Sequence, residues 1–226
     1  MFVRRSLTVL ALALSVVRCA DQPTALRPAS PTPRAVRWAG GSAPHLTATR
    51  SLPTGVGILQ TPPLSLDQYS VSFWAVRGES RSVQIHYRDV DGATEHPFLL
   101  LTATDPESVP GMEELAQGDS VLITVTVDTV NVGVSLEPTG LRFGTPAQLQ
   151  IWYSGAGGDL NGDGVADSTD AYVEKQLLGL WYREVSAEDW SQVPAIQSLE
   201  DKSFTYALPH FCDYELSYLL DWVVSW

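Results

Sequence analysis

The chain has 226 residues, of which 44% are hydrophobic and 18% charged, and its formal net charge is −12. This length accommodates one ordinary domain with appendages, or two small domains. The mean hydropathy near zero excludes a disordered chain and an integral membrane protein, and the negative charge excludes nonspecific nucleic-acid binding because a phosphate backbone would be repelled.

The charge is unevenly distributed along the chain. The first 50 residues contain seven arginines and one acidic residue, Asp21, whereas residues 51–226 contain 7 basic and 25 acidic residues. The second part therefore has a formal charge of −18. Such a surface keeps a folded domain soluble, holds divalent cations nearby and opposes docking on anionic lipid headgroups.

Residues 1–19 have the pattern of a secretory signal peptide. Two arginines precede an apolar run, Leu7–Val17, that is too short to span a bilayer as a permanent helix. Cys19 lies where bacterial lipoproteins carry their lipidated cysteine, although Arg18 departs from the Gly or Ala usual before it. We expect an exported protein, periplasmic or at the cell surface, and leave open whether it is lipid-anchored through Cys19 or released.

A proline-rich stretch, residues 20–64, follows the signal. Eight of the 15 prolines lie between Pro23 and Pro63. Proline fixes φ and removes a backbone donor, so this stretch is predicted to be an extended, solvated tether. A single folded domain is then expected over residues 65–226.

From about Ser65 onward, apolar and polar residues alternate with a period of two. The runs that do so are 71–75, 83–87, 123–127, 130–136, 149–153 and 212–218. Each run predicts a strand with one buried and one solvated face, and turn residues such as Gly118-Asp119 separate them. Short strands without an amphipathic helix in most of the chain predict an all-β fold, an antiparallel β-sandwich.

The segment Asp159–Asp170 has the spacing of an EF-hand-like calcium loop. Positions 1, 3, 5, 7, 9 and 12 of the loop would be Asp159, Asn161, Asp163, Val165 (through its backbone carbonyl), Asp167 and Asp170. Gly164 stands at position 6, where the loop turns sharply. Four carboxylates within twelve residues repel one another without a counter-ion, so we predict one bound Ca²⁺.

Position 12 is Asp rather than Glu, a variant found in dockerin modules, and Asp159–Gly179 resembles one dockerin half. A dockerin uses two such segments, and this sequence contains one. Residues 170–178 fit a short helix, residues 177–182 fit the next strand, and both fit if the helix ends near Gly179. A dockerin-like protein-interaction segment is one alternative function.

Several short motifs follow one another between Leu136 and Tyr218. They are Leu136-Glu-Pro-Thr-Gly-Leu-Arg-Phe143, Pro146-Ala-Gln-Leu-Gln-Ile-Trp-Tyr153, Leu180-Trp-Tyr182, Trp190 and Leu208-Pro-His-Phe-Cys-Asp-Tyr214. Their order resembles the ZU-five type β-sandwich of zonula occludens proteins, netrin receptors and ankyrins, and of bacterial surface proteins. The resemblance implies a binding or structural module.

The last of these motifs contains His210-Phe211-Cys212. Some members of the resembled family cleave themselves between the Phe and Ser of His-Phe-Ser, and the resemblance implies an N-to-S shift at Cys212 with His210 assisting. The second alternative function is therefore a self-cleaving domain. Otherwise we expect His210 to cap a strand and Cys212 to pack inward.

The sequence contains no Gly-x-Ser-x-Gly, His-Glu-x-x-His or phosphate-cradling glycine loop, so we expect no enzyme apart from that self-proteolysis. Trp74, Trp152 and Trp181 are predicted either to stack on carbohydrate or to cover a sheet. The leading prediction is an exported binding or structural module, stabilised by calcium, whose ligand is an unknown protein or glycan.

Overall fold

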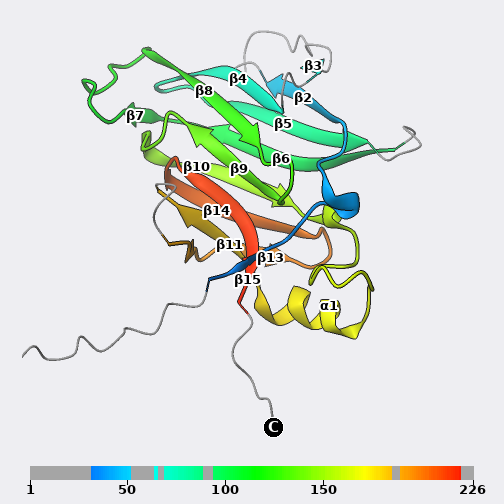
Figure 1. Cartoon of the computed structure of the whole chain (residues 1–226). Helices are drawn as coiled ribbons and strands as arrows, with labels where there is room; N and C mark the ends of the chain where they lie inside the picture. Colours follow the sequence, from blue (N-terminus) through cyan, green and yellow to red (C-terminus); the bar gives the residue numbers. More distant parts are fainter. Residues whose placement is uncertain (1–31, 52–63, 66–68, 89–93, 185–188, 220–226) are drawn as a thin grey trace, which may run out of the picture. The chain divides into compact units, whose positions relative to one another are not determined.

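The computed structural model describes residues 32–51, 64–65, 69–88, 94–184 and 189–219. Within these ranges the chain forms two antiparallel β-sheets, packed as a β-sandwich, and one short α-helix (Figure 1). The predicted fold class is confirmed. The predicted signal peptide and Cys19 lie outside the described residues. In the part of the chain that is described, no helix is long and apolar enough to cross a membrane.

The first sheet has seven described strands. In spatial order six of them are β12 (Ser191–Gln192), β11 (Leu178–Arg183), β15 (Asp213–Tyr218), β9 (Gly133–Glu137), β8 (Ser120–Val127) and β4 (Ser70–Val76). The seventh, β1 (Arg34–Ala35), pairs with the last two residues of β15, while β9 pairs with the first three. One edge of β15 therefore adjoins β11, and its other edge is shared by β9 and β1.

The second sheet has eight described strands. They are β13 (Ile196–Ser198), β14 (Ser203–His210), β10 (Arg142–Trp152), β6 (Glu95–Ala103), β5 (Arg81–Arg88), β2 (Leu46–Ser51) and β3 (Leu64–Ser65), with β7 (Pro106–Ser108) paired to β10. Strands that follow one another in the chain can lie in different sheets. β14 belongs to the second sheet and β15, the next strand, to the first (Figure 1).

Apolar side chains from both sheets fill one core, and the predicted alternating runs supply much of it. All six runs coincide with or overlap strands. In β15 the inward residues Tyr214, Leu216 and Tyr218 are buried, and the Tyr214 ring lies 6.2 Å from that of Tyr206 in the opposite sheet. Burial of side chains of this size stabilises the fold by about 1.5–3 kcal/mol each.

The predicted tether is wrong for residues 34–51, which belong to the sandwich. β1 pairs with β15, and β2 pairs with β5 along six residues. Trp38 is buried, packs on Phe98 at 4.7 Å between ring centroids, and donates from Nε1 to the carbonyl oxygen of Asp128 at 2.8 Å. The proline count, averaged over 20–64, hid the alternating apolar residues Val36 and Trp38 before Pro44 and Leu46 and Ala48 after it.

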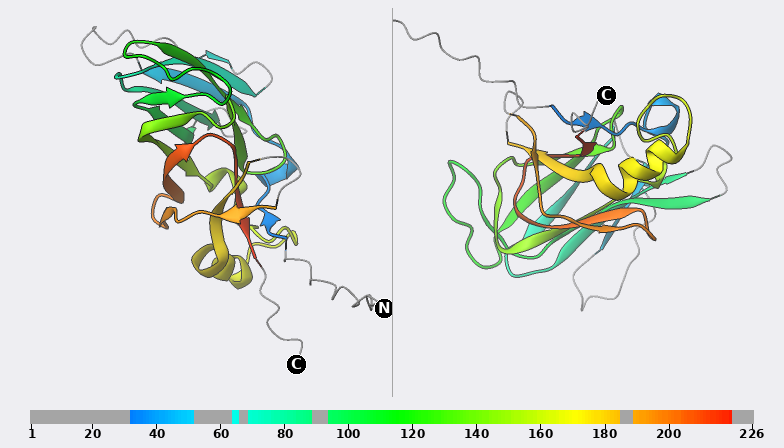
Figure 2. Two further views of the ribbon diagram at one scale, coloured as in Figure 1. Left: turned by 90° about the vertical axis from the view of Figure 1, so that its left-hand side faces the viewer. Right: turned by 90° about the horizontal axis from the view of Figure 1, so that it is seen from below.

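Helix and strand both follow the acidic segment, as the sequence allowed. α1 (Ser168–Tyr172) continues as a π-helical turn, η3 (Val173–Leu177), which leads directly into β11. Two single 3₁₀ turns, η1 (Ala39–Gly41) and η2 (Ser154–Ala156), complete the described elements. Figure 2 shows α1 at one end of the sandwich, and there the side chain of Gln197 in β13 donates to the carbonyl oxygen of Glu174 at 2.9 Å.

Candidate functional site

The first half of the acidic segment is wound around the carboxylate of Asp159. Its Oδ1 accepts backbone N–H groups from Gly162 at 2.8 Å and Asp163 at 3.1 Å, and its Oδ2 accepts that of Gly164 at 2.8 Å. Both glycines have positive φ, 76° and 91°, a conformation that a side chain disfavours. The turn predicted at Gly164 is therefore present.

Asn161 and Asp163 are hydrogen-bonded to each other, and Asp163 is also hydrogen-bonded to Val165. The N–H of Asp163 donates to Oδ1 of Asn161 at 2.8 Å, and the Asn161 amide donates to Oδ2 of Asp163 at 2.9 Å. The N–H of Val165 donates to Oδ1 of Asp163 at 2.9 Å. The oxygen-bearing side chains at positions 1, 3 and 5 thus belong to one hydrogen-bonded turn.

Asp170 closes the segment from inside the protein. Its side chain is only 4% exposed. Oδ1 accepts the N–H groups of Leu160 at 2.8 Å and Asn161 at 3.0 Å, and Oδ2 accepts that of Asp167 at 2.9 Å. Burial raises the pKa of Asp170, but these backbone donors together outweigh burial and lower the pKa below its ordinary value. Position 12 therefore ties the start of the loop to the start of α1.

Asp167 begins α1 as its N-cap residue. Its Oδ1 accepts the N–H of Thr169 at 2.7 Å, and Asp167 and Asp170 together form a capping box. An N-cap carboxylate satisfies helix N–H groups that have no intrahelical partner. The second half of the loop is thus a helix start in its own right, which accounts for two of the four carboxylates without a metal.

The donor set is compatible in chemistry with calcium. All predicted ligands are oxygens, which Ca²⁺ prefers, and an ionised carboxylate oxygen can accept two partners. Oδ1 of Asp170 already has two N–H donors, so Asp170 has capacity left on Oδ2 only. Among the described residues, no three His, Cys, Asp or Glu side chains gather as a metal centre. An ion here would have to use the Asn161 amide and the Val165 carbonyl as well.

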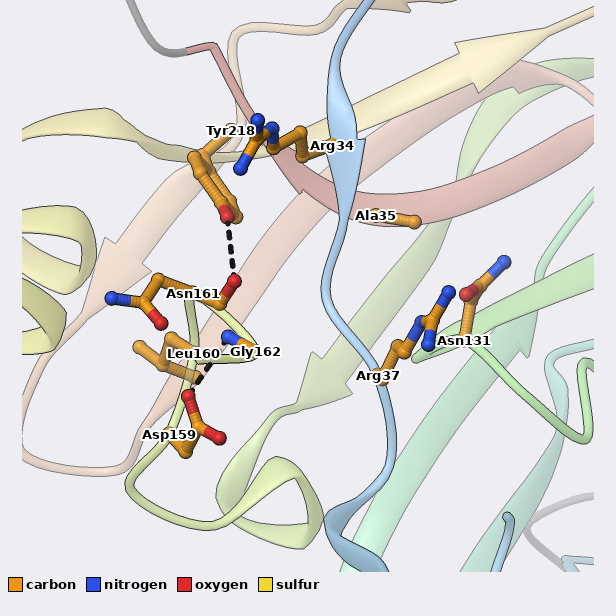
Figure 3. Close-up of a pocket in the computed structure, with 9 residues that line it drawn as sticks. All are labelled: Arg34, Ala35, Arg37, Asn131, Asp159, Leu160, Asn161, Gly162 and Tyr218. Atoms are coloured by element: carbon orange, nitrogen blue, oxygen red, sulfur yellow. Dashed lines mark hydrogen bonds between the residues drawn. The ribbon is translucent and has the colours of Figure 1, made fainter. Parts of the chain in front are cut away.

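The start of the loop borders a cavity of about 530 Å³ between the loop, β1 and β15 (Figure 3). The hydroxyl of Tyr218, the last residue of β15, donates to the carbonyl oxygen of Asn161 at 3.2 Å. Arg34 and Arg37 line the other side of the cavity and are exposed. The loop is therefore attached directly to the strand that both β9 and β1 contact.

His210 and Cys212 are close in sequence but have different surroundings. Nε2 of His210 lies 3.7 Å from Oε1 of Glu184, and its ring meets Tyr182 edge-on. Cys212 is buried, and burial raises the pKa of its thiol to about 12, with Asp213 also raising it. The thiol is therefore protonated at neutral pH, which is unfavourable for the predicted nucleophile.

The three tryptophans singled out in the sequence do not share a surface. Trp74 is 54% exposed on β4 of the first sheet, whereas Trp152 lies on β10 of the second sheet. Trp181 is buried, and its Nε1 donates to the carbonyl oxygen of Ser217 at 2.9 Å. Of the two alternatives predicted for Trp181, burial excludes an exposed carbohydrate-stacking surface and agrees with a side chain that covers the sheet.

Sequence reasoning missed the polar face of β15. Glu215 and Ser217 occupy the positions of the alternating run that were expected to face solvent, yet both are buried. Their neighbours on the same face include Trp181 and Arg183 of β11. A period-two pattern identifies the two faces of a strand but gives no information on what covers the polar one.

Comparison with known protein families, with curated proteins and with solved structures found no match. The resemblance to ZU-five type sandwiches and to a dockerin half therefore rests on the sequence motifs alone.

Proposed function

We propose that the chain is an exported, non-enzymatic binding or structural module, a β-sandwich stabilised by one Ca²⁺ in the loop Asp159–Asp170. The observation that carries this proposal is the loop itself. Asp159, Asn161 and Asp163 share one turn, and buried Asp170 joins the two ends of the segment. The ion would rigidify an inter-strand segment and take no part in chemistry.

The residues that would hold the ion are those at the alternating positions of the loop. They are Asp159, Asn161, Asp163, the carbonyl oxygen of Val165, Asp167 and Oδ2 of Asp170. A bound divalent cation supplies positive charge that offsets the mutual repulsion of four carboxylates. Because Tyr218 bonds the loop to β15, ordering of the loop would be passed on to the sandwich.

Calcium titration of the full chain tests the proposal. Isothermal calorimetry and native mass spectrometry should show one Ca²⁺ per chain, and Asp163→Ala should abolish it, because Asp163 is exposed and its loss removes a ligand without opening the core. Asp201→Ala is the matched control, since Asp201 is also an exposed turn carboxylate. Absence of binding at millimolar calcium, or equal loss in the control, would reduce the loop to a polar turn.

A dockerin-like interaction role is the second candidate, and exposed apolar side chains favour it. Val165 in the loop and Tyr172 at the end of α1 are both large and exposed. Exposed side chains of this kind beside a metal loop are suited to partner contact. If this role holds, a recombinant cohesin domain should bind the full chain, and Tyr172→Ala should weaken that binding while leaving calcium binding unchanged.

A further inference from the structure

A cavity of about 220 Å³ lies on the face of the first sheet that points away from the core. Its floor is formed by three adjacent strands: Asp213 and Glu215 of β15 are flanked by Ser135 and Gly133 of β9 on one side and by Arg183 of β11 on the other. Trp190, just before β12, and the turn after β8, with Asp128 and Asn131, form its walls.

The charged pair in this cavity is held in a fixed position. Nη2 of Arg183 donates to Oδ2 of Asp213 at 3.1 Å, and the hydroxyl of Ser135 donates to Oδ1 of the same carboxylate at 2.7 Å. The guanidinium carbon of Arg183 lies 4.5 Å from the ring centroid of Trp190. Arg183 is thus clamped between an aromatic ring and a carboxylate, and Asp213 is neutralised locally.

Glu215 has hydrogen-bonding capacity that the fold does not use. It is only 7% exposed, and the Ser217 hydroxyl donates to its Oε1 at 2.7 Å. The neighbouring Arg183 also has an unused donor, because among the described residues its Nε is buried and has no hydrogen-bond partner. A buried polar group left without a partner costs about 1–3 kcal/mol. Folding alone therefore does not explain this nitrogen, which belongs to a cavity-lining side chain.

Glycine at position 133 makes room for this arrangement. A Cβ at Gly133 would lie 2.8 Å from the carbonyl oxygen of Tyr214 and 3.0 Å from Cβ of Glu215. Any side chain here would push β9 away from β15 and displace Glu215. The close approach of the two backbones is thus part of how the cavity is built.

The charges lining the cavity determine which ligand it suits. Arg183 and Asp213 pair with each other, and an anionic ligand would meet the remaining carboxylates of Asp128 and Glu215. A neutral ligand with many hydroxyls leaves this ion pair intact, because the carboxylates accept its O–H groups and the Arg183 and Asn131 side chains donate to its oxygens. Trp190 adds an aromatic surface.

The size of the cavity also favours a small neutral ligand with many hydroxyls. Sites for drug-sized molecules occupy about 300–1,000 Å³, so this smaller cavity suits a single sugar ring. We propose that the cavity between β9, β15, β11 and Trp190 binds one ring of a neutral saccharide, with Glu215, Arg183 and Asn131 bonding its hydroxyls and Trp190 contacting its ring. This proposal gives a ligand class to the binding role proposed above and rests on that role.

The test is a screen of the full chain on an array of neutral glycans, followed by calorimetric titration of the best hit. We expect binding, and a loss of about tenfold or more in affinity in both Trp190→Ala and Glu215→Gln, since each removes one contact worth roughly 1–3 kcal/mol. Trp74→Ala is the matched control, because Trp74 lies on the same sheet and should leave affinity unchanged. Glu215→Gln preserves shape, and circular dichroism verifies that each variant is folded.

Two results would overturn the saccharide site. The first is an array on which no neutral glycan binds, or on which only sulfated, uronic-acid or amino sugars bind. The second is a folded Trp190→Ala or Glu215→Gln variant with unchanged affinity. The array is run both in calcium and in chelator, and calcium binding is titrated separately. Failure of the calcium loop then appears as a missing calcium isotherm, independently of the array.

Discussion

Asp170 is a carboxylate that the fold buries and nevertheless favours in its ionised form. Three backbone N–H groups replace the water that burial removes. Their combined effect holds the pKa of Asp170 below its ordinary value, although burial acts in the opposite direction. A group whose pKa is lower in the folded state adds stability above its unfolded pKa, and that stability is lost as the pH falls through the folded pKa.

We therefore predict that Asp170→Asn lowers the free energy of unfolding at neutral pH. The loss should be about 1–3 kcal/mol, because an amide nitrogen replaces one acceptor of a buried charged network. The difference from the unmodified chain should shrink as the pH falls below about 4, where the carboxylate of the unfolded chain is protonated. Urea titrations in chelator across this pH range provide the measurement.

Asp163→Asn is the control for that prediction. Asp163 is exposed and lies in the same loop, so its substitution should change stability in chelator by much less. If the two variants lose the same stability, or if the Asp170→Asn difference stays constant with pH, the buried carboxylate is not the group that links the two ends of the segment.

Cys212 shows how burial favours one of two interpretations of the same motif. With its thiol pKa raised to about 12, Cys212 is protonated and enclosed by the core. We predict that the Phe211–Cys212 bond stays intact in the purified chain, and that the thiol is alkylated at pH 8 only after unfolding. Denatured mass spectrometry measures both. A released Cys212–Trp226 fragment that Cys212→Ala prevents would establish self-cleavage.

The positions of strands could be predicted from the sequence more readily than the residues that pack around each strand. Alternation identified β4, β5, β8, β9, β10 and β15, because one face of each strand meets the core and period two records that contact. β1 was missed because it has only two residues, and β2 was missed because it lies between Pro44 and Pro53. The cavity on β15 could not be inferred, since Gly133, Arg183 and Trp190 are brought together only by pairing of strands distant in sequence.

For the acidic loop, the local turn was predictable from the sequence, but the attachment of the loop to the sandwich was not. Its spacing predicted the turn at Gly164, because the contacts that form this turn lie within a few residues of one another. The attachment of the loop to the sandwich was beyond such reasoning. Tyr218 lies 57 residues from Asn161 in the sequence, and its hydroxyl donates the hydrogen bond that joins the two residues.

Removing that hydroxyl should weaken the coupling between loop and β15. We predict that Tyr218→Phe lowers the free energy of unfolding by about 0.5–1.5 kcal/mol, since the ring still packs and a single hydrogen bond is lost. If calcium binds, its affinity should fall a few-fold, because the loop is held less firmly. Tyr172→Phe, on exposed α1, is the matched control and should change neither value. Unchanged stability in Tyr218→Phe would mean that this hydrogen bond does not couple the loop to β15.

β15 connects the features described above. Its first residues, Asp213 and Glu215, form the floor of the outer cavity, and its last residue, Tyr218, anchors the acidic loop. β1 pairs with that last part of the strand, so the chain before residue 50 supports the loop end of the sandwich. Two strands of the proline-rich stretch, β1 and β2, therefore belong to the sandwich.

That dependence gives a prediction for the whole domain. A chain beginning at residue 32 should unfold at the same temperature as the full chain, because it keeps β1, β2 and the buried side chains of Val36, Trp38, Leu46 and Ala48. A chain beginning at residue 65 loses all four. Burial of each large side chain contributes about 1.5–3 kcal/mol, against a total stability of about 5–15 kcal/mol for an ordinary domain.

The shorter chain should therefore be unfolded or aggregated at room temperature, with little near-ultraviolet circular dichroism and no cooperative melting transition. Loss of Trp38 alone exposes Phe98 and leaves the carbonyl oxygen of Asp128 without its indole donor. If the chain from residue 65 instead melts cooperatively at the temperature of the longer one, β1 and β2 are appendages to a sandwich that is complete without them, and the boundary expected from the proline count is the correct one.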